Sequence, residues 1–177
     1  MVNNRLAQHE LYQRFVYMMK GVCLRYAQNE AEAEDILQEA FVQAFRNLSQ
    51  YSGKGPLGAW LRKITVNKSL EQYRKTKALA QKSSTWEIKD SDSQVPDNAI
   101  EQLELNDLLE KIRQLPVGFR TVFNLYAVEG YNHKEIGELL GISEGTSKSQ
   151  YSRARIMLRN MIEQEQLVDQ KKLGYAE

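Results

Sequence analysis

The stretch Gly130–Arg159, GYNHKEIGELLGISEGTSKSQYSRARIMLR, decides the fold of this chain of 177 residues. Its pattern predicts two short helices joined by a tight turn. Gly130 ends the preceding helix, because a left-handed C-terminal position favours glycine. Asn132 can cap the next helix, and Glu135 follows at the spacing of a capping box. Gly141 then allows the sharp turn that separates the two helices.

The second helix of this stretch is basic on one side. Ser143 is a good N-cap for it, and its predicted buried face comprises Tyr151, Ala154, Leu158 and Met161 or Ile162. The opposite face carries Lys148, Ser149, Ser152 and Arg159, flanked by Thr146, Arg153 and Arg155. Cationic groups neutralise phosphates, and hydroxyl and guanidinium groups hydrogen-bond base edges in the major groove. The stretch therefore predicts a helix-turn-helix that binds duplex DNA. The alternative is a helical hairpin with a solvated basic face.

Composition excludes several classes of protein. No apolar run approaches the roughly 18 residues of a membrane span, and the polar N-terminus lacks a signal core, so we expect a cytoplasmic protein without membrane insertion. Cys23 is the single cysteine, and a small core residue explains it better than a redox sensor. His9, His133 and Cys23 are too scattered to bind a metal, and His133, at a helix start, is expected to be exposed. We predict no metal, no cofactor and no catalytic residue.

The rest of the chain predicts an all-α protein, because prolines are few and apolar residues recur at helical spacing. A polar segment without apolar periodicity separates two small helical domains and is expected to be a flexible linker. Within it, Trp86 and Ile88 are either a stray patch or an anchor. The predicted boundaries are a first domain at 1–80, the linker at 81–98, a second domain at 99–162, and a flexible tail at 163–177.

Three helices are predicted in the first domain. The first is marked by Leu11, Phe15, Met18, Val22 and Tyr26; the second follows a capping box at Asn29 and Glu32; the third runs from about Pro56 to about Lys77. The second helix carries an acidic stripe that, by composition alone, is typical of a solvated face; its residues are Glu32, Asp35, Gln38, Glu39 and Gln43. The third mixes basic, amide and apolar groups on one face (Lys63, Val66, Asn67, Leu70, Tyr73 and Arg74), which suits unpaired nucleic acid but also a helix buried on two sides.

A family resemblance follows from the order of these motifs. Asp35–Phe41 reads DILQEAF and Ala59–Ile64 reads AWLRKI, with Asn67 beyond it; a polar linker and the helix-turn-helix come next. This order resembles the extracytoplasmic-function (ECF) group of sigma-70-family factors, over about residues 10–162. In such proteins the first domain is called region 2 and the second region 4.

The resemblance implies a function and the residues that carry it. A sigma factor directs RNA polymerase core to specific promoters and assists promoter opening. The family's D-x-x-Q-E-x-F segment faces the clamp helices of the polymerase β′ subunit, and region 4 contacts the β flap. The implied polymerase-binding residues are Asp35, Gln38 and Glu39. The implied −10 element residues are Lys63 and Asn67, then Arg62, Glu71 and Arg74, with Tyr51 and Lys54 near a flipped base. The implied −35 element residues are Thr146, Lys148, Ser149 and Gln150, alongside Ser152, Arg153 and Arg155.

Departures from the family pattern qualify these assignments. Ser147 occupies an apolar position, and Gln150 replaces a usual Arg, which changes the expected base preference because amides favour adenine. Glu71 stands where Asp is frequent. An anti-sigma factor is a candidate partner by resemblance alone. The main rival is a helix-turn-helix regulator that binds duplex DNA without docking on polymerase; an enzyme using paired carboxylates of the acidic stripe is the more distant rival.

Overall fold

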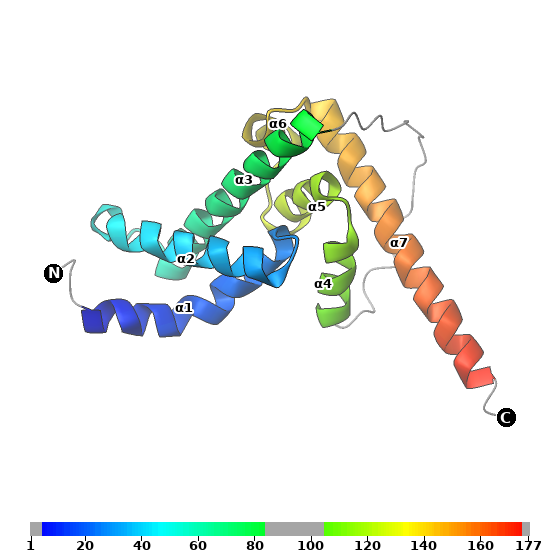
Figure 1. Ribbon diagram of the computed structural model, residues 1–177, viewed down its shortest axis with the longest axis horizontal. Coiled ribbons are helices and arrows are strands. Elements are labelled where there is room, and N and C mark those ends of the chain that lie inside the picture. The colour runs from blue at the N-terminus through cyan, green and yellow to red at the C-terminus, as the bar shows by residue number, and fades with distance from the viewer. Residues whose placement is uncertain (1–4, 84–104, 175–177) are drawn as a thin grey trace. The chain divides into compact units, whose positions relative to one another are not determined.

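The computed structural model describes residues 5–83 and 105–174, and the elements within these ranges are helical (Figure 1). They form two units, one from α1 to α3 and one from α4 to α7. Most of the predicted linker at 81–98, with Trp86 and Ile88, lies outside the described residues. No helix in the described ranges is long and apolar enough to cross a bilayer.

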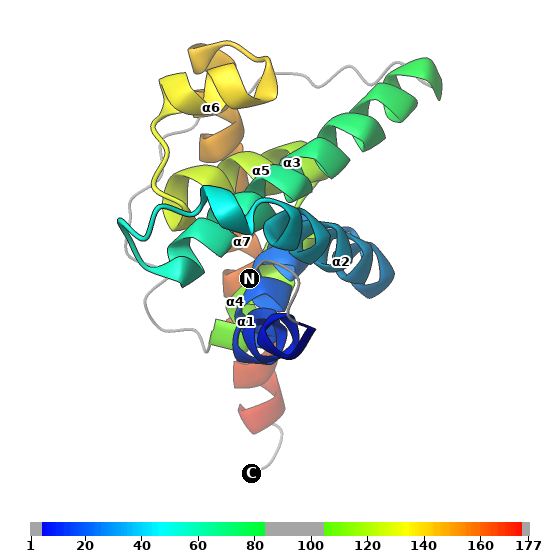
Figure 2. The same cartoon turned by 90° about the vertical axis from the view of Figure 1, so that its left-hand side faces the viewer.

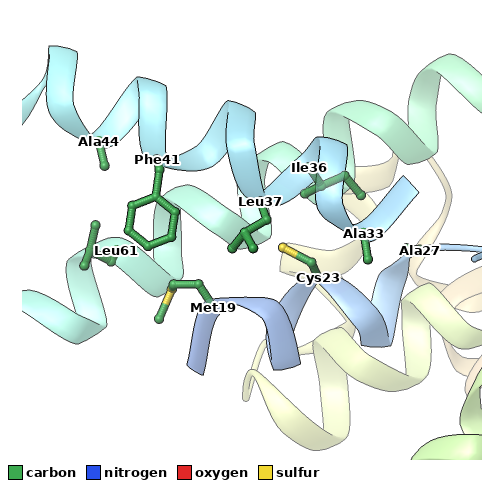
Figure 3. Close-up of a cluster of buried hydrophobic side chains, with 9 residues drawn as sticks. All are labelled: Met19, Cys23, Ala27, Ala33, Ile36, Leu37, Phe41, Ala44 and Leu61. Carbon is green, nitrogen blue, oxygen red and sulfur yellow. The ribbon is translucent and has the colours of Figure 1, made fainter. Parts of the chain in front are cut away.

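The first unit is a bundle of three helices that pack against one another. Its elements are α1 (Arg5–Tyr26), α2 (Glu30–Arg46), the short 3-10 helix η1 (Leu48–Gln50) and α3 (Leu57–Ser83). Figure 3 shows Met19 and Cys23 of α1 facing Leu37 and Phe41 of α2, with Leu61 of α3 beside them. Burial of these apolar side chains away from water is the main contribution that stabilises the packing of the three helices.

Two details of the first unit differ from the prediction. Met18 was placed on the apolar stripe, but it is 53% exposed whereas Met19 is 1% exposed. The buried stripe steps by four residues after Phe15, because a helix has about 3.6 residues per turn. The capping box at Asn29 is half formed: its side chain accepts from the Glu32 amide at 2.9 Å, but the Glu32 carboxylate accepts from the amide of Gln28.

The second unit packs three shorter helices and a π-helical turn against one long helix. Its elements are α4 (Leu105–Gln114), α5 (Val117–Phe123), η2 (Asn124–Val128), α6 (His133–Leu140) and α7 (Glu144–Gly174). The core cluster of Ile112, Leu115, Phe119, Phe123, Ala154 and Leu158 lies between α4, α5 and α7. The unit is therefore built around the basic helix that the sequence singled out.

The long helix α7 extends beyond the predicted end of the second domain. The backbone of residues 163–174, predicted as a flexible tail, is helical. One cause lies at Lys111 of α4, which is 7% exposed and pairs with the carboxylate of Glu165 on α7. A buried ammonium requires such a partner. Ile162, which is 1% exposed, continues the packed face toward this pair.

Candidate nucleic-acid interface and docking surface

The predicted helix-turn-helix is present in α6 and α7, which lie side by side at their junction (Figures 1 and 2). Its capping box is complete: the Asn132 side chain accepts from the Glu135 amide at 2.9 Å, and the Glu135 carboxylate accepts from the Asn132 amide at 2.8 Å. Gly130 and Gly141 have φ values of 78° and 64°, which non-glycine residues rarely adopt. Local chemistry thus sets both ends of α6.

Gly137 was not singled out in the sequence, although it shapes the turn. A Cβ atom at this position would lie 2.8 Å from the carbonyl oxygen of Ile142. The Ile142 amide donates to the Gly137 carbonyl at 3.0 Å, so the two backbones meet at Gly137. The available signal was a glycine inside a helical apolar pattern, which often marks close packing.

The helix α7 begins as predicted, because the Ser143 hydroxyl accepts from the Thr146 amide at 2.9 Å. Ala154, Leu158 and Ile162 are buried, and Tyr151 is half-buried. Lys148, Ser149 and Ser152 are exposed, whereas the other predicted contacts are half-buried: Thr146, Gln150, Arg153 and Arg155. The predicted face therefore has a polar, exposed centre with longer side chains at its margins.

Two of these predicted contacts are not directly available to DNA. The Lys148 ammonium lies 2.6 Å from the Glu144 carboxylate, and this hydrogen bond lowers the pKa of Glu144. A phosphate that binds Lys148 must compete with Glu144. The amide oxygen of Gln150 is buried without a hydrogen-bond partner among the described residues. Gln150 must turn outward before it can contact a base.

Ser147 and His133 meet between the two helices. Ser147 is fully buried, and its hydroxyl shares a hydrogen bond of 3.0 Å with the His133 Nδ1 atom. His133, expected to be exposed, is half-buried. Burial lowers the pKa of the imidazole, Lys148 lowers it further, and Glu144 opposes them. The exposure prediction was wrong because the start of α6 packs against α7 through this pair.

The predicted strand-binding face lies along α3. Lys63, Asn67 and Arg74 are exposed, and their spacing places them within about 40° of one another. Val66 and Leu70, predicted on the same face, are 2% and 1% exposed. The solvent-accessible part of this face therefore consists of polar side chains.

Three other residues of α3 belong to the candidate face. Arg62 is half-buried, and so is Glu71, whose carboxylate accepts from Lys68 at 2.7 Å. Burial raises the pKa of Tyr73, which keeps its phenol neutral. The Glu71 carboxylate is therefore paired within α3, and its contact with the −10 element remains a prediction.

The loop before α3 is held in shape by Tyr51. The Tyr51 hydroxyl donates to the Gly55 carbonyl, and its ring lies 5.5 Å from the Trp60 ring. Lys54 is exposed between these anchors. The contacts of Tyr51 orient the loop, and the place of Tyr51 and Lys54 near a flipped base remains a prediction.

The predicted docking surface lies on α2. Asp35, Gln38 and Glu39 are exposed, while Phe41 is 4% exposed and faces the core. Val42, absent from the prediction, is 48% exposed and lines a shallow pocket with Gln38 and Glu39. Its spacing of seven from Asp35 was the signal, because it places both on one side of the helix.

Lys68 joins the docking helix to α3. Its ammonium lies 4.0 Å from the Glu39 carboxylate and 2.7 Å from that of Glu71. The charge of Glu39 is therefore partly balanced from α3, whereas Asp35 stands one turn away on the exposed face. The two carboxylates offer different targets to a basic partner.

The single cysteine lies in the core of the first unit. Cys23 is fully buried, and burial raises the pKa of its thiol to about 12. Over residues 5–83 and 105–174, no three His, Cys, Asp or Glu side chains gather as metal ligands.

Comparison with known proteins gives matches over both units. Family models described as Sigma-70 region 2 and Sigma-70, region 4 match residues 11–79 and 105–158. The chain is 32% identical over 163 residues to the ECF RNA polymerase sigma factor SigW of Bacillus subtilis, with 86% of each chain covered. It is 26% identical over 164 residues to the ECF RNA polymerase sigma-E factor of Haemophilus influenzae, again with 86% of each covered.

A solved structure is similar in fold. It is the sigma factor RpoE of Bartonella quintana in complex with the anti-sigma factor NepR, with a TM-score of 0.51 and 24% sequence identity. The match covers 87% of this chain and 97% of that chain.

Proposed function

The chain belongs to the ECF group of the sigma-70 family, whose members direct RNA polymerase to promoters, and we propose that α2 docks it on the polymerase core while α3 and α7 bind promoter DNA. One observation carries this proposal. A single chain pairs an exposed acidic helix face with a basic helix-turn-helix. A regulator that only binds duplex DNA has no use for the first of these.

Docking is assigned to Asp35, Gln38 and Glu39 of α2, facing the β′ clamp helices. The three side chains are exposed on one helix, and complementary charge steers a basic partner to such a surface. Val42 adds an exposed apolar side chain beside them. Region 4 is proposed to contact the β flap.

The −10 element is assigned to α3 and the loop before it. Lys63, Asn67 and Arg74 supply cationic and amide groups along one line, which suits the backbone and edges of an unpaired strand. Lys54 at the loop is placed near a flipped base. Base extrusion costs a few kcal/mol, and these contacts offset part of it.

The −35 element is assigned to α7, with its first turns in the major groove. Lys148, Ser149 and Ser152 form the exposed centre of the contact, with Arg153 and Arg155 on phosphates at its margin. Arg155 also lies 5.9 Å from the Tyr151 ring, which restricts its position. Specificity then comes from few base contacts and affinity from several phosphate contacts.

The proposed role requires no covalent chemistry in this chain. The polymerase catalyses RNA synthesis, and the chain works in the cytoplasm where polymerase and promoters meet. The structure similar to this fold contains an anti-sigma factor. We therefore include an anti-sigma factor among the proposed partners, beside RNA polymerase core and promoter DNA.

Run-off transcription tests the proposed function. We expect purified core polymerase to produce discrete transcripts from bacterial genomic fragments when this chain is added, because the two DNA contacts recruit core to particular sites. Mapping the transcript starts then identifies the promoters. Core alone is the control. A chain that binds DNA but never binds core would favour the rival, a helix-turn-helix regulator.

Two substitutions in α7 separate base contacts from phosphate contacts. Gln150→Arg is expected to shift preference toward guanine at one position of the −35 element, by about 1–3 kcal/mol of discrimination. Arg153→Ala is expected to weaken binding on all sequences and to reduce the salt dependence of binding. Selection from a randomised −35 element measures both. An unchanged base profile in Gln150→Arg would remove Gln150 from the contact set.

A further inference from the structure

A small cluster of side chains joins the helices of the helix-turn-helix, and we call its members His133, Ser147, Tyr126 and Tyr151 the His133 cluster. The His133 ring stacks on the Tyr126 ring with centroids 4.3 Å apart and an interplanar angle of 11°. The Tyr151 ring lies 5.8 Å from His133 and 4.5 Å from Tyr126. The cluster thus connects the π-helical turn η2, the start of α6 and the first two turns of α7.

The buried hydroxyl of Ser147 requires a hydrogen-bond partner. Ser147 is 0% exposed, on the side of α7 that faces α6. A buried hydroxyl without a hydrogen bond costs about 1–3 kcal/mol, whereas an apolar side chain would need no partner. The Nδ1 atom of His133 provides the hydrogen bond at 3.0 Å.

The π-helical turn brings Tyr126 to the imidazole. Residues Asn124–Val128 carry wider backbone hydrogen bonds, with the Glu129 amide donating to Asn124 and the Tyr131 amide to Leu125. Such turns are frequent at functional sites because they re-aim side chains. Here Tyr126 covers one face of His133, so the imidazole has little freedom to leave Ser147.

We propose that His133 is a positioning residue for promoter recognition: its hydrogen bond to Ser147 fixes the angle between α6 and α7 and so the aim of the exposed side chains of α7. This inference rests on the proposed function of α7. Lys148 and Ser149 follow Ser147 directly, so a rotation of α7 at Ser147 moves both. The effect passes through α7 and involves no contact of His133 with a base.

The surroundings of His133 favour its neutral form. On α7 it faces Lys148, Glu144 and Tyr151; η2 contributes Tyr126, and Lys134 follows it on α6. It also stands at the N-terminus of α6, where the helix dipole disfavours a cation. Burial and Lys148 lower the pKa of the imidazole and outweigh Glu144.

The sign of the pH effect follows from that lowered pKa. Between the folded pKa and the usual value of about 6.5, the unfolded chain binds the proton and the folded chain does not. The stabilisation by neutral His133 is therefore complete above about pH 6.5 and is lost as pH falls toward the folded pKa. A side chain at position 133 that only packs and does not titrate would give no such dependence of stability on pH.

The test is a double-substitution cycle in the full chain, with His133→Phe, Ser147→Ala and both together. His133→Phe keeps a ring beside Tyr126 but removes the nitrogen, and Ser147→Ala removes the hydroxyl. The probe is a duplex promoter with a randomised −35 element, bound to holoenzyme reconstituted with core polymerase. We expect each single variant to bind the preferred duplex about 3- to 10-fold more weakly, which corresponds to the net contribution of one hydrogen bond. The double variant should bind no more weakly than either single variant.

Two further variants distinguish positioning from bulk packing. His133→Asn places an amide near the Nδ1 position, and we expect it to recover part of the affinity and selectivity without titrating. His9→Phe is the matched control, because His9 is exposed on α1. In thermal unfolding between pH 5 and pH 8, we expect His133→Phe to lose the fall in stability that the wild type shows below about pH 6.5, and His9→Phe to keep it.

The outcomes separate this inference from the function on which it rests. Additive losses in the double variant, or identical pH profiles of the wild type and His133→Phe, overturn the inference. So does unchanged sequence selection by both single variants when the wild-type holoenzyme selects a sequence. A wild-type holoenzyme that selects no sequence at all overturns the proposed function as well.

Discussion

Gly137→Ala is expected to destabilise the α4–α7 unit by about 1–3 kcal/mol and to remove binding to the −35 element. The added Cβ would stand 2.8 Å from the Ile142 carbonyl oxygen, which belongs to the backbone and cannot rotate away. The turn between α6 and α7 must open, and the exposed face of α7 then loses its orientation. Thermal unfolding and holoenzyme binding to promoter duplexes measure the two effects.

Gly145→Ala is the matched control for that substitution. The nearest atom to its Cβ is the Ser143 hydroxyl oxygen at 3.7 Å, an ordinary contact. Alanine is favoured over glycine in a helix by up to about 1 kcal/mol, so this variant should be as stable as the wild type or more so. If the two variants unfold alike, the close approach at Gly137 does not govern the turn.

Reversing two charges on α2, in Asp35→Lys with Glu39→Lys, is expected to weaken binding to core polymerase by at least about 10- to 100-fold. Both carboxylates are exposed, and the reversed charges would repel a basic partner. The fold should persist, because the buried side of α2 is untouched. Affinity for purified core, measured by competition with an unaltered chain, reports the loss.

The controls for the reversal address charge and neighbours. Glu10→Lys makes the same change at an exposed site of α1 and should bind core normally. Glu39→Gln removes a charge without placing a lysine near the Lys68 ammonium, which lies 4.0 Å from the Glu39 carboxylate. Normal core binding by the reversed variant would show that α2 is a solvated face, as its composition alone suggests.

Local chemistry explains which features of the fold were predictable. The Asn132–Glu135 capping box, the Ser143 cap and the left-handed Gly130 and Gly141 each depend on neighbours within a few residues, and each is present. The helical class and the buried face of α7 at Ala154 follow from periodicity. These features could be predicted from the sequence because their causes lie within a single segment of the chain.

Contacts between segments explain what the sequence did not reveal. Ser147 reads as a weak point in the apolar pattern, yet its hydroxyl is paired with His133, fourteen residues away in the chain. Gly137 reads as a poor helix former until the Ile142 carbonyl is placed against it. Neither relation can be seen before the angle between α6 and α7 is known.

The same distinction between local causes and contacts between segments applies to the candidate site. Asp35, Gln38 and Glu39 were found through the resemblance and are exposed, but their role in docking remains a prediction. Tyr51 was predicted to lie near a flipped base; its hydroxyl donates to the Gly55 carbonyl within the loop, and its role at the base also remains a prediction. A motif identifies a position, and only the neighbours in space decide whether its side chain is available to a ligand.

The burial of Cys23 has a practical consequence for labelling. Its thiol is inaccessible, and a pKa of about 12 leaves a negligible thiolate fraction at neutral pH. Maleimide dyes should therefore not react with Cys23 in the folded chain. Single cysteines introduced at exposed sites, one on α3 at Lys75 and one on α6 at Glu138, would then carry a donor and an acceptor fluorophore, so that energy transfer reports the separation of the two units in the free chain and on core polymerase.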